Sequence, residues 1–183
     1  DNEVIWASKA GGGTDVSTQV IEYLRDHDLL DLYNSYIKEC DNKLTFLFEW
    51  CAPDNRIVVN YKEETLFLCG IRIKESGAYI QPEIVKEEAD RNNMPFVGSH
   101  NTFNLEETKA LEREEGRVLF FDTGQMYKAK SDWYLQLHKA KEYLQFEKYI
   151  CQICLNDTLD DFLPLIKTFS DEEADKLIKF NTT

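Results

Sequence analysis

Apolar residues recur at helical spacing in two long parts of the chain. Between residues 15 and 40 they follow a three-to-four-residue period, interrupted by the polar run Asp26-His27-Asp28. The same period returns after Ser131 and continues to the end of the chain. The pattern therefore predicts a broken helix over 15–40 and later helices over 132–156, 158–168 and 170–180. Ser131 and Ser170 stand where a helix N-cap is expected, and weaker helical character extends over 82–92 and 104–113.

Strands are predicted where β-branched and aromatic residues cluster between turn residues. Such runs cover residues 3–7, 43–51, 56–61 and 65–73. A further pair of apolar runs flanks Asp122-Thr123-Gly124 and predicts a β-hairpin over 116–130. Mixed strands and helices thus give way to helices alone between residues 140 and 157. We predict an α+β domain over 1–145 and the start of an all-helical C-terminal domain over 146–183.

The hairpin carries the strongest chemical signal. Glu115-Gly116 opens its first strand, and Lys128-x-Lys130-Ser131 closes its second. The two lysines alternate along the strand and therefore point to one face. A carboxylate can hold a divalent cation, while two ammonium groups can neutralise charge as phosphorus changes partners. Solvated surface lysines are the ordinary alternative when this pattern stands alone.

The hairpin segment resembles the nucleotidyltransferase domain of ATP-dependent RNA ligases of the bacteriophage type, the RNA ligase 1 family. In that family an EG-x-V strand leads through a short turn to K-x-K-S-x-W-Y-x-x-L-H, which residues 128–138 match. Residues 48–58 resemble the family's F-E-F-x-x-P-x-N-R-I-V segment. Ser8-Lys9-Ala10-Gly11 resembles its S-K-G-S element, with Ala10 in place of glycine. The resemblance implies an ATP-grasp-like nucleotidyltransferase fold of antiparallel sheets with flanking helices.

The resemblance also implies site residues. Lys128 and Lys130 would contact the nucleotide α-phosphate, and Glu115 would position a divalent metal. Phe48 would lie on adenine, and Glu49 would lie near the ribose or a metal. The remaining nucleotide contacts would come from Gly116, where backbone can approach a ligand closely, and from Lys9 beside the nucleotide.

Several of these residues also have a structural interpretation. Glu114 competes with Glu115 for the metal-binding role, although the Glu-Gly order favours Glu115. The alternative role for Glu115 is a salt bridge within the acidic run 112–115. Phe48 in isolation is typical of core packing. The Cys151-x-x-Cys154 pair has neither a second pair nor neighbouring histidines, so we expect buried helix thiols in place of a zinc site.

The family's K-x-D-G motif, whose lysine takes AMP covalently, does not occur in this sequence. In the family this motif lies upstream of the S-K-G-S element. Here the sequence begins at Asp1, only eight residues before Lys9, so the motif would lie before Asp1. We therefore expect an internal fragment of a longer ligase. A naturally split ligase, with the missing N-terminal segment as a separate chain, and a degenerate relative are the alternatives.

Composition limits the class of protein and its cellular compartment. The 183 residues are 43% hydrophobic, which is typical of a globular chain. No apolar run is long enough to span a bilayer, and five cysteines without framework spacing favour the cytoplasm, that of the host cell if the source is viral. The net charge of −13 opposes RNA binding, so a local cluster of lysines would have to meet the phosphates.

The resemblance implies an RNA ligase that uses ATP and Mg²⁺ or Mn²⁺ and that carries AMP as an enzyme-bound intermediate. It would join RNA 5′-phosphate and 3′-hydroxyl ends, tRNA among them, beside a polynucleotide kinase/phosphatase partner that heals the ends, with no membrane partner. A DNA ligase, a GTP-using capping enzyme and a non-catalytic nucleotide-binding relative are the alternatives. The K-A-K-S-D-W-Y junction favours the RNA ligase branch.

Overall fold

The structure, a computed structural model, describes residues 3–40, 42–55, 59, 61–156, 158–167 and 170–181. The chain forms two compact units. The first comprises residues 1–56, 61–102 and 120–126, and the second comprises residues 57–60, 103–119 and 127–183.

An antiparallel pair of long strands is the framework of the first unit. Strand β3 (Leu44–Cys51) pairs with β4 (Thr65–Ile73), and Trp50 lies opposite Leu66. The register shifts between Leu47 and Phe48, which is the signature of a β-bulge. Because of this shift, the buried residues of β4 have even numbers up to Leu68, and the next buried residue is the odd-numbered Ile71.

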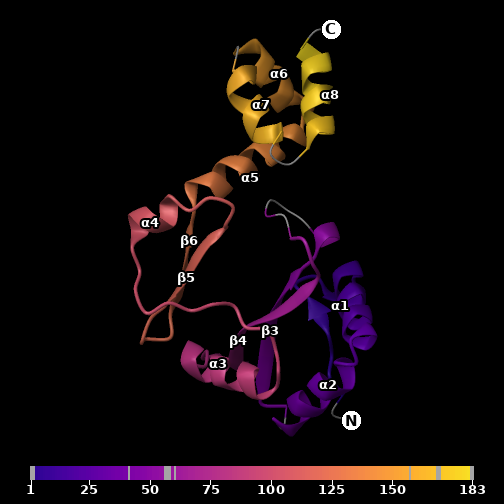
Figure 1. The fold of residues 1–183 in the computed structure, drawn as a ribbon, viewed down its shortest axis with the longest axis vertical. Helices are drawn as coiled ribbons and strands as arrows, with labels where there is room; N and C mark the ends of the chain where they lie inside the picture. Colours follow the sequence, from indigo (N-terminus) through magenta and orange to yellow (C-terminus); the bar gives the residue numbers. More distant parts are fainter. Residues whose placement is uncertain are drawn as a thin grey trace. The chain divides into compact units, whose positions relative to one another are not determined.

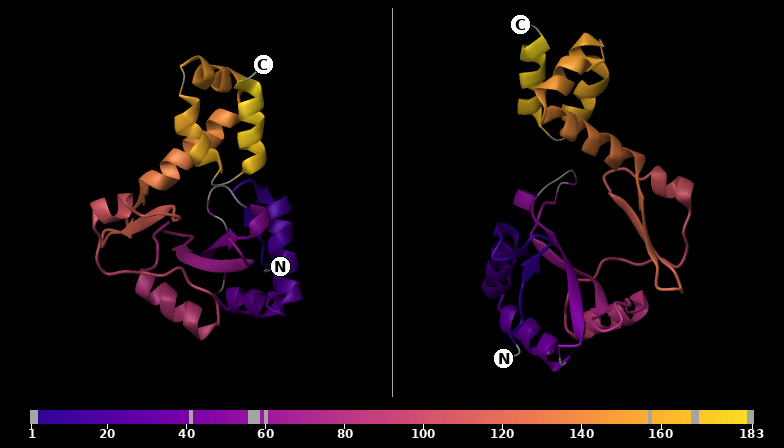
Figure 2. Two further views of the ribbon diagram at one scale, coloured as in Figure 1. Left: turned by 45° about the horizontal axis from the view of Figure 1, so that its top comes forward. Right: turned by 180° about the vertical axis from the view of Figure 1, so that it is seen from behind.

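Three helices flank these strands. Helices α1 (Asp15–Asp26) and α2 (Leu30–Glu39) lie on one side, and α3 (Pro82–Arg91) lies on the other (Figures 1 and 2). Thr14 caps α1 by accepting a hydrogen bond from the Ser17 backbone N–H at 3.3 Å. The core contains, among others, Leu24, Tyr33, Trp50, Leu68 and Val85. The predicted break in the helix over 15–40 is confirmed.

The short segments of this unit differ from the prediction. The strand expected over 3–7 is wrong, because only β1 (Ala7–Ser8) forms, paired with β2 (Gly11–Gly12). Ile5 is 81% exposed, and the Trp6 indole N–H donates to the Asn34 side chain at 3.0 Å, so side chains and not a strand ladder hold the segment. Of the strand expected over 56–61, residues 56–58 and 60 lie outside the described residues, while 59 and 61 are not in a strand. A 3-10 turn, η1 (Pro53–Asn55), follows β3.

In the second unit a short helix precedes the hairpin along the chain. Helix α4 (Leu105–Lys109) is shorter than the helix expected over 104–113, and Arg113 has a positive φ of 63° that helical backbone does not adopt. Strands β5 (Gly116–Phe120) and β6 (Met126–Lys130) pair, which confirms the predicted hairpin. The connecting residues, together with Phe120 and Met126, group with the first unit. Helix α5 (Asp132–Leu144) follows directly after Ser131.

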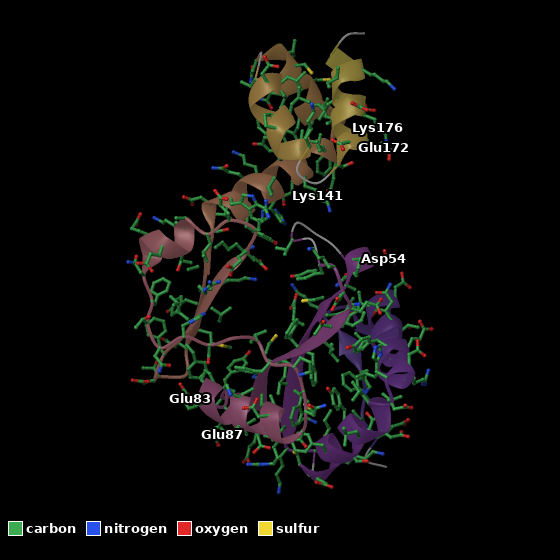
Figure 3. All side chains as sticks on the ribbon, viewed as in Figure 1. Asp54, Glu83, Glu87, Lys141, Glu172 and Lys176 are labelled. Carbon is green, nitrogen blue, oxygen red and sulfur yellow. The ribbon has the colours of Figure 1, made fainter. Side chains whose placement is uncertain are left out.

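The rest of the second unit is helical. The helix expected over 132–156 ends at Leu144, and α6 (Glu147–Leu155) starts a new one, followed by α7 (Leu159–Lys167) and α8 (Asp171–Asn181) (Figure 1). Buried Ile153, Leu159, Ile166, Ala174 and Leu177 form their core. On the surface of α8, Lys176 pairs with Glu172 at 2.8 Å (Figure 3).

The α+β class predicted from the sequence is confirmed by these elements, whereas the domain boundary at 145/146 stays a prediction. Among the described residues no helix has the length and apolar character that a membrane span requires. The expectation of buried CxxC thiols is wrong for Cys151, which is exposed, and Cys154 is half-buried. Within the described part of the chain no three potential metal ligands come together.

Candidate functional site

Three charged residues of the hairpin form one ion cluster, which we call the hairpin ion cluster. Glu115 precedes β5, and Lys128 and Lys130 lie on β6. The Glu115 Oε1 atom is 2.7 Å from Lys128 Nζ and 3.3 Å from Lys130 Nζ. The glutamate side chain is 34% exposed, so ligands can reach the cluster. Two ammonium groups on one carboxylate leave the cluster with a net charge of +1, suited to a phosphate.

Backbone contacts beside the cluster fix its geometry. Gly116 has φ +143°, and a Cβ atom added there would lie 2.0 Å from the Ala129 carbonyl oxygen and 2.7 Å from Lys130 Cα. Only glycine therefore permits the two strands to approach so closely. The predicted role of Gly116 in close approach to a ligand stays a prediction; here its close neighbour is β6.

Ser131 joins the end of β6 to the start of β5. Its side chain is fully buried; its hydroxyl donates to the Glu114 carbonyl at 2.7 Å and accepts from the Tyr134 N–H at 3.1 Å. Its own N–H donates to the Glu115 carbonyl at 2.9 Å. The predicted N-cap is confirmed, and the same residue also holds the backbone of Glu115 beside the lysines.

The structure distinguishes the two candidate glutamates by their partners. Glu114 forms an ion pair with Arg117, whereas Glu115 contacts both lysines. The geometry therefore assigns Glu115, and not Glu114, to the hairpin ion cluster.

The sequence interpretation did not identify a contact between Lys130 and Tyr134. The Lys130 Nζ atom lies 4.6 Å from the centre of the Tyr134 ring, within the range of a cation–π interaction. Tyr134 is itself buried on α5, so its ring is a fixed surface that restricts where the ammonium group can point. Lys130 and Tyr134 are four residues apart, and this spacing predicts a contact only if the strand is known to end and the helix to begin at Ser131.

Opposing effects act on the Glu115 carboxyl. Burial raises its pKa, but hydrogen bonds and charge attraction from Lys128 and Lys130 lower it by more, so the pKa lies below its ordinary value. The carboxylate is therefore ionised at neutral pH and able to hold both lysines.

We expect the stability contributed by Glu115 to depend on acid pH. Because the folded-state pKa is depressed, this contribution is fully present above the unfolded-state value of about 4.3 and is lost as pH falls through the folded-state pKa. Urea unfolding of the wild type and of Glu115→Gln should show a difference at pH 7 that shrinks below pH 4. A difference that stays constant over this range would contradict the ion cluster.

A second group of predicted residues lines one cavity within the first unit. This cavity has a volume of about 600 Å³ and is bordered by Lys9, Phe48 and Glu49. Its wall also includes the segment from Glu3 to Ser8 and residues 44–50 of β3. The structure thus brings Lys9, Phe48 and Glu49 together around one space large enough for a small ligand.

Phe48 both packs and lines this cavity. Its ring stacks with that of Tyr33 at a centroid distance of 6.2 Å and is tilted against Trp6 at 5.5 Å. Trp6, which was assigned no role from the sequence, is therefore a further aromatic residue in the cavity wall, beside Phe46, Phe48 and Trp50. The adenine-binding role of Phe48 stays a prediction.

Lys9 lies at the tip of a tight turn between β1 and β2, and its side chain is exposed. The Ser8 hydroxyl accepts from the Ala10 N–H at 3.1 Å and from Thr14 Oγ1 at 3.0 Å, which fixes the turn despite the alanine. Arg56, Ile57 and Val58 of the related segment lie outside the described residues.

Comparison with known proteins identifies the class. The sequence model of a family described as RNA ligase matches residues 1–143, which include both groups of candidate residues. The chain therefore belongs to this family, the phage-type RNA ligases.

A particular relative comes from Autographa californica nuclear polyhedrosis virus and is named as a bifunctional polynucleotide kinase/RNA ligase. It is 30% identical over an alignment of 144 residues, and the match covers 73% of this chain. The match covers 19% of the relative, so the chain spans about a fifth of its length.

Proposed function

We propose that this chain is the nucleotide-binding part of an ATP-dependent RNA ligase with a nucleotidyltransferase fold. The observation that carries the proposal is the hairpin ion cluster within the segment matched by the family. Two lysines beside one ionised glutamate provide a net positive site that is fixed by backbone contacts. Such preorganised charge is what transfer at phosphorus requires.

In the proposed sealing reaction, the 3′-hydroxyl oxygen of one RNA strand attacks the 5′-phosphate of an adenylated strand. A new P–O bond forms, the bond between the 5′-phosphorus and the AMP phosphate oxygen breaks, AMP leaves, and the hydroxyl proton passes to solvent. Lys128 and Lys130 stabilise the negative charge that accumulates on the phosphate oxygens. Glu115 holds both ammonium groups in place, and Tyr134 restricts Lys130.

The proposed adenosine site is the cavity of the first unit, where Phe48 supplies an aromatic ring, Glu49 a carboxylate and Lys9 a cation. Enzyme-bound AMP is the proposed intermediate between ATP and RNA. The nucleophilic lysine of the family's K-x-D-G motif has no counterpart in this sequence, so the roles proposed here concern binding and phosphate chemistry.

A divalent cation, Mg²⁺ or Mn²⁺, fits the donor set of the hairpin. Magnesium is usually held by one or two carboxylates together with substrate phosphates and water. Both lysine contacts of Glu115 fall on Oε1, so Oε2 is not used in either contact. Glu115 would hold the ion, which would supply further charge neutralisation at the phosphate.

The proposed partners are RNA strands with 5′-phosphate and 3′-hydroxyl ends, tRNA among them, in the cytoplasm. The virus relative is named for both a kinase and a ligase. A polynucleotide kinase that prepares RNA ends is therefore the proposed partner activity, either on the same polypeptide or on a separate one.

Nucleotide binding tests this proposal against a GTP-using capping enzyme. We expect AMP to bind more tightly than GMP, and Phe48→Leu, which keeps an apolar side chain but removes the ring, to weaken AMP binding about 5–100-fold. Titration calorimetry with both nucleotides measures this, with Phe103→Leu, an exposed phenylalanine that does not border the cavity, as control. Tighter binding of GMP, or unchanged AMP binding by Phe48→Leu, would contradict the proposal.

A further inference from the structure

Four aromatic rings and two lysines meet where α5 ends and α6 begins. The Phe146 ring lies edge-on to Tyr149 at 5.8 Å, and Tyr149 stacks with Tyr143 at 5.0 Å. Tyr143 in turn stacks with Phe162 at 5.9 Å. We call Phe146, Tyr149 and Tyr143, together with their lysines, the α5–α6 aromatic cluster.

The lysines of this cluster lie against its rings. The Lys148 Nζ atom is 4.7 Å from the centre of the Tyr149 ring and 5.8 Å from that of Phe146. Lys139 Nζ is 5.4 Å from the centre of the Tyr143 ring. Both lysines are exposed, so each ammonium group borders an aromatic surface and solvent at once.

Packing does not account for Phe146. Tyr143 and Phe162 pack against the buried core of α6–α8, but Phe146 is not among the described side chains that do so, and 52% of it is exposed. It occupies the N-cap position of α6 and supplies no side-chain cap bond, where Ser, Thr, Asp or Asn would stabilise the helix. Phe146 therefore places an exposed aromatic ring where a capping side chain would have stabilised α6.

Local charge in this region is opposite in sign to that of the whole chain. Residues 126–156 contain five lysines (128, 130, 139, 141 and 148) against three acidic residues (132, 142 and 147), giving +2 in a chain of −13. Lys141 lies on α5 (Figure 3). Glu142 and Glu147 flank the cluster; a Glu142 carboxylate oxygen lies 3.6 Å from His138 Nδ1, and Glu147 precedes Lys148 in the sequence.

We propose that the α5–α6 aromatic cluster binds single-stranded RNA, with bases stacking on Phe146 and Tyr149 and phosphates contacting Lys148 and Lys139. Aromatic side chains interleaved with cations bind single strands in this way, largely without regard to base sequence. This inference rests on the proposed function, because RNA is the substrate proposed for the hairpin ion cluster. Helix α5 has 13 residues and is therefore about 20 Å long, so an RNA contacting both its ends spans several nucleotides.

The test is the affinity of the chain for a fluorescein-labelled 12-nucleotide single-stranded RNA at several salt concentrations. Phe146→Ala should weaken binding about 5–100-fold, as expected for loss of one stacked base. Lys148→Ala should reduce the slope of log affinity against log salt by about 1. Leu155→Ala, on the same helix and 84% exposed, and Lys176→Ala on α8 are the matched controls and should bind as the wild type does.

Circular dichroism establishes that each variant is folded, which is expected because the substituted side chains are exposed. Affinities of Phe146→Ala and Lys148→Ala within twofold of the wild type would overturn the inference and leave the cluster to another partner, such as a protein. Joining of pre-adenylated RNA by the wild type, measured in parallel, separates this failure from failure of the proposed function. If the wild type joins RNA while both variants bind RNA normally, the proposed RNA-binding role of the α5–α6 aromatic cluster is wrong and the proposed ligase function stands.

Discussion

Replacing Lys128 or Lys130 with alanine is expected to lower the rate of ligase adenylation by about 10²–10³-fold, the usual cost of removing one preorganised charge donor. Each lysine contacts Glu115, and each would stabilise charge at the α-phosphate. The measurement is the transfer of labelled AMP from α-labelled ATP to the enzyme, in a polypeptide that contains these residues together with a nucleophilic lysine. Arginine at either position should rescue poorly, because its planar fork does not match the point contact of an ammonium group.

The matched control is Lys109→Ala. Lys109 lies in the same unit and forms a single surface ion pair with Glu106 at 3.5 Å, so its removal should leave adenylation unchanged. Normal adenylation by both Lys128→Ala and Lys130→Ala would remove the hairpin ion cluster from the chemistry. Equal losses in the control would instead indicate a general effect of surface charge.

Gly116→Ala is expected to separate β5 from β6 and abolish activity. The new Cβ atom would meet the Ala129 carbonyl oxygen at 2.0 Å, and backbone cannot move aside as a flexible side chain can. The positive φ adds strain of about 1–3 kcal/mol for a residue other than glycine. Thermal unfolding should show a lower midpoint, and Glu115 should lose its contact with the lysines.

Gly124→Ala separates the two causes. Gly124 also has a positive φ, +79°, but a Cβ there would meet nothing within 4 Å. It should therefore show strain without collision and a smaller loss of stability than Gly116→Ala. Equal losses in the two variants would mean that the close approach of the strands at Gly116 contributes nothing.

Much of the fold could be predicted because periodicity reports directly on burial. The apolar runs rich in Phe and Leu marked β3 and β4, and the helical spacing of α1 and α2 exposes one side of each helix and buries the other. The segment over 3–7 shows the limit of this reasoning. It has strand-forming residues, but a strand also requires a partner, and between described residues only Ala7 and Ser8 have one. The end of α5 at Leu144 was missed for a similar reason, because apolar spacing continues across the break.

In the site, contacts between residues of the sequence motifs could be predicted, whereas contacts that depend on the fold could not. The alternation of Lys128 and Lys130 correctly placed both on one face, and proximity to Glu115 followed from the hairpin. The Glu-Gly order also favoured Glu115 over Glu114, and the geometry agrees, because Glu114 pairs with Arg117 while Glu115 contacts both lysines. Tyr134 could not be assigned, because its contact with Lys130 depends on the direction in which α5 leaves Ser131.

Joining of a pre-adenylated RNA strand tests the central claim most directly, because this substrate bypasses the need for a nucleophilic lysine. The chain would be incubated with a pre-adenylated 5′-end, an acceptor 3′-hydroxyl end and Mg²⁺, without ATP. The account predicts one AMP released per joined strand by the wild type, and joining at least about 10²-fold slower by Lys128→Ala/Lys130→Ala. Joining by this double variant at the wild-type rate, or none by the wild type, would contradict it, and the second result would favour a non-catalytic relative.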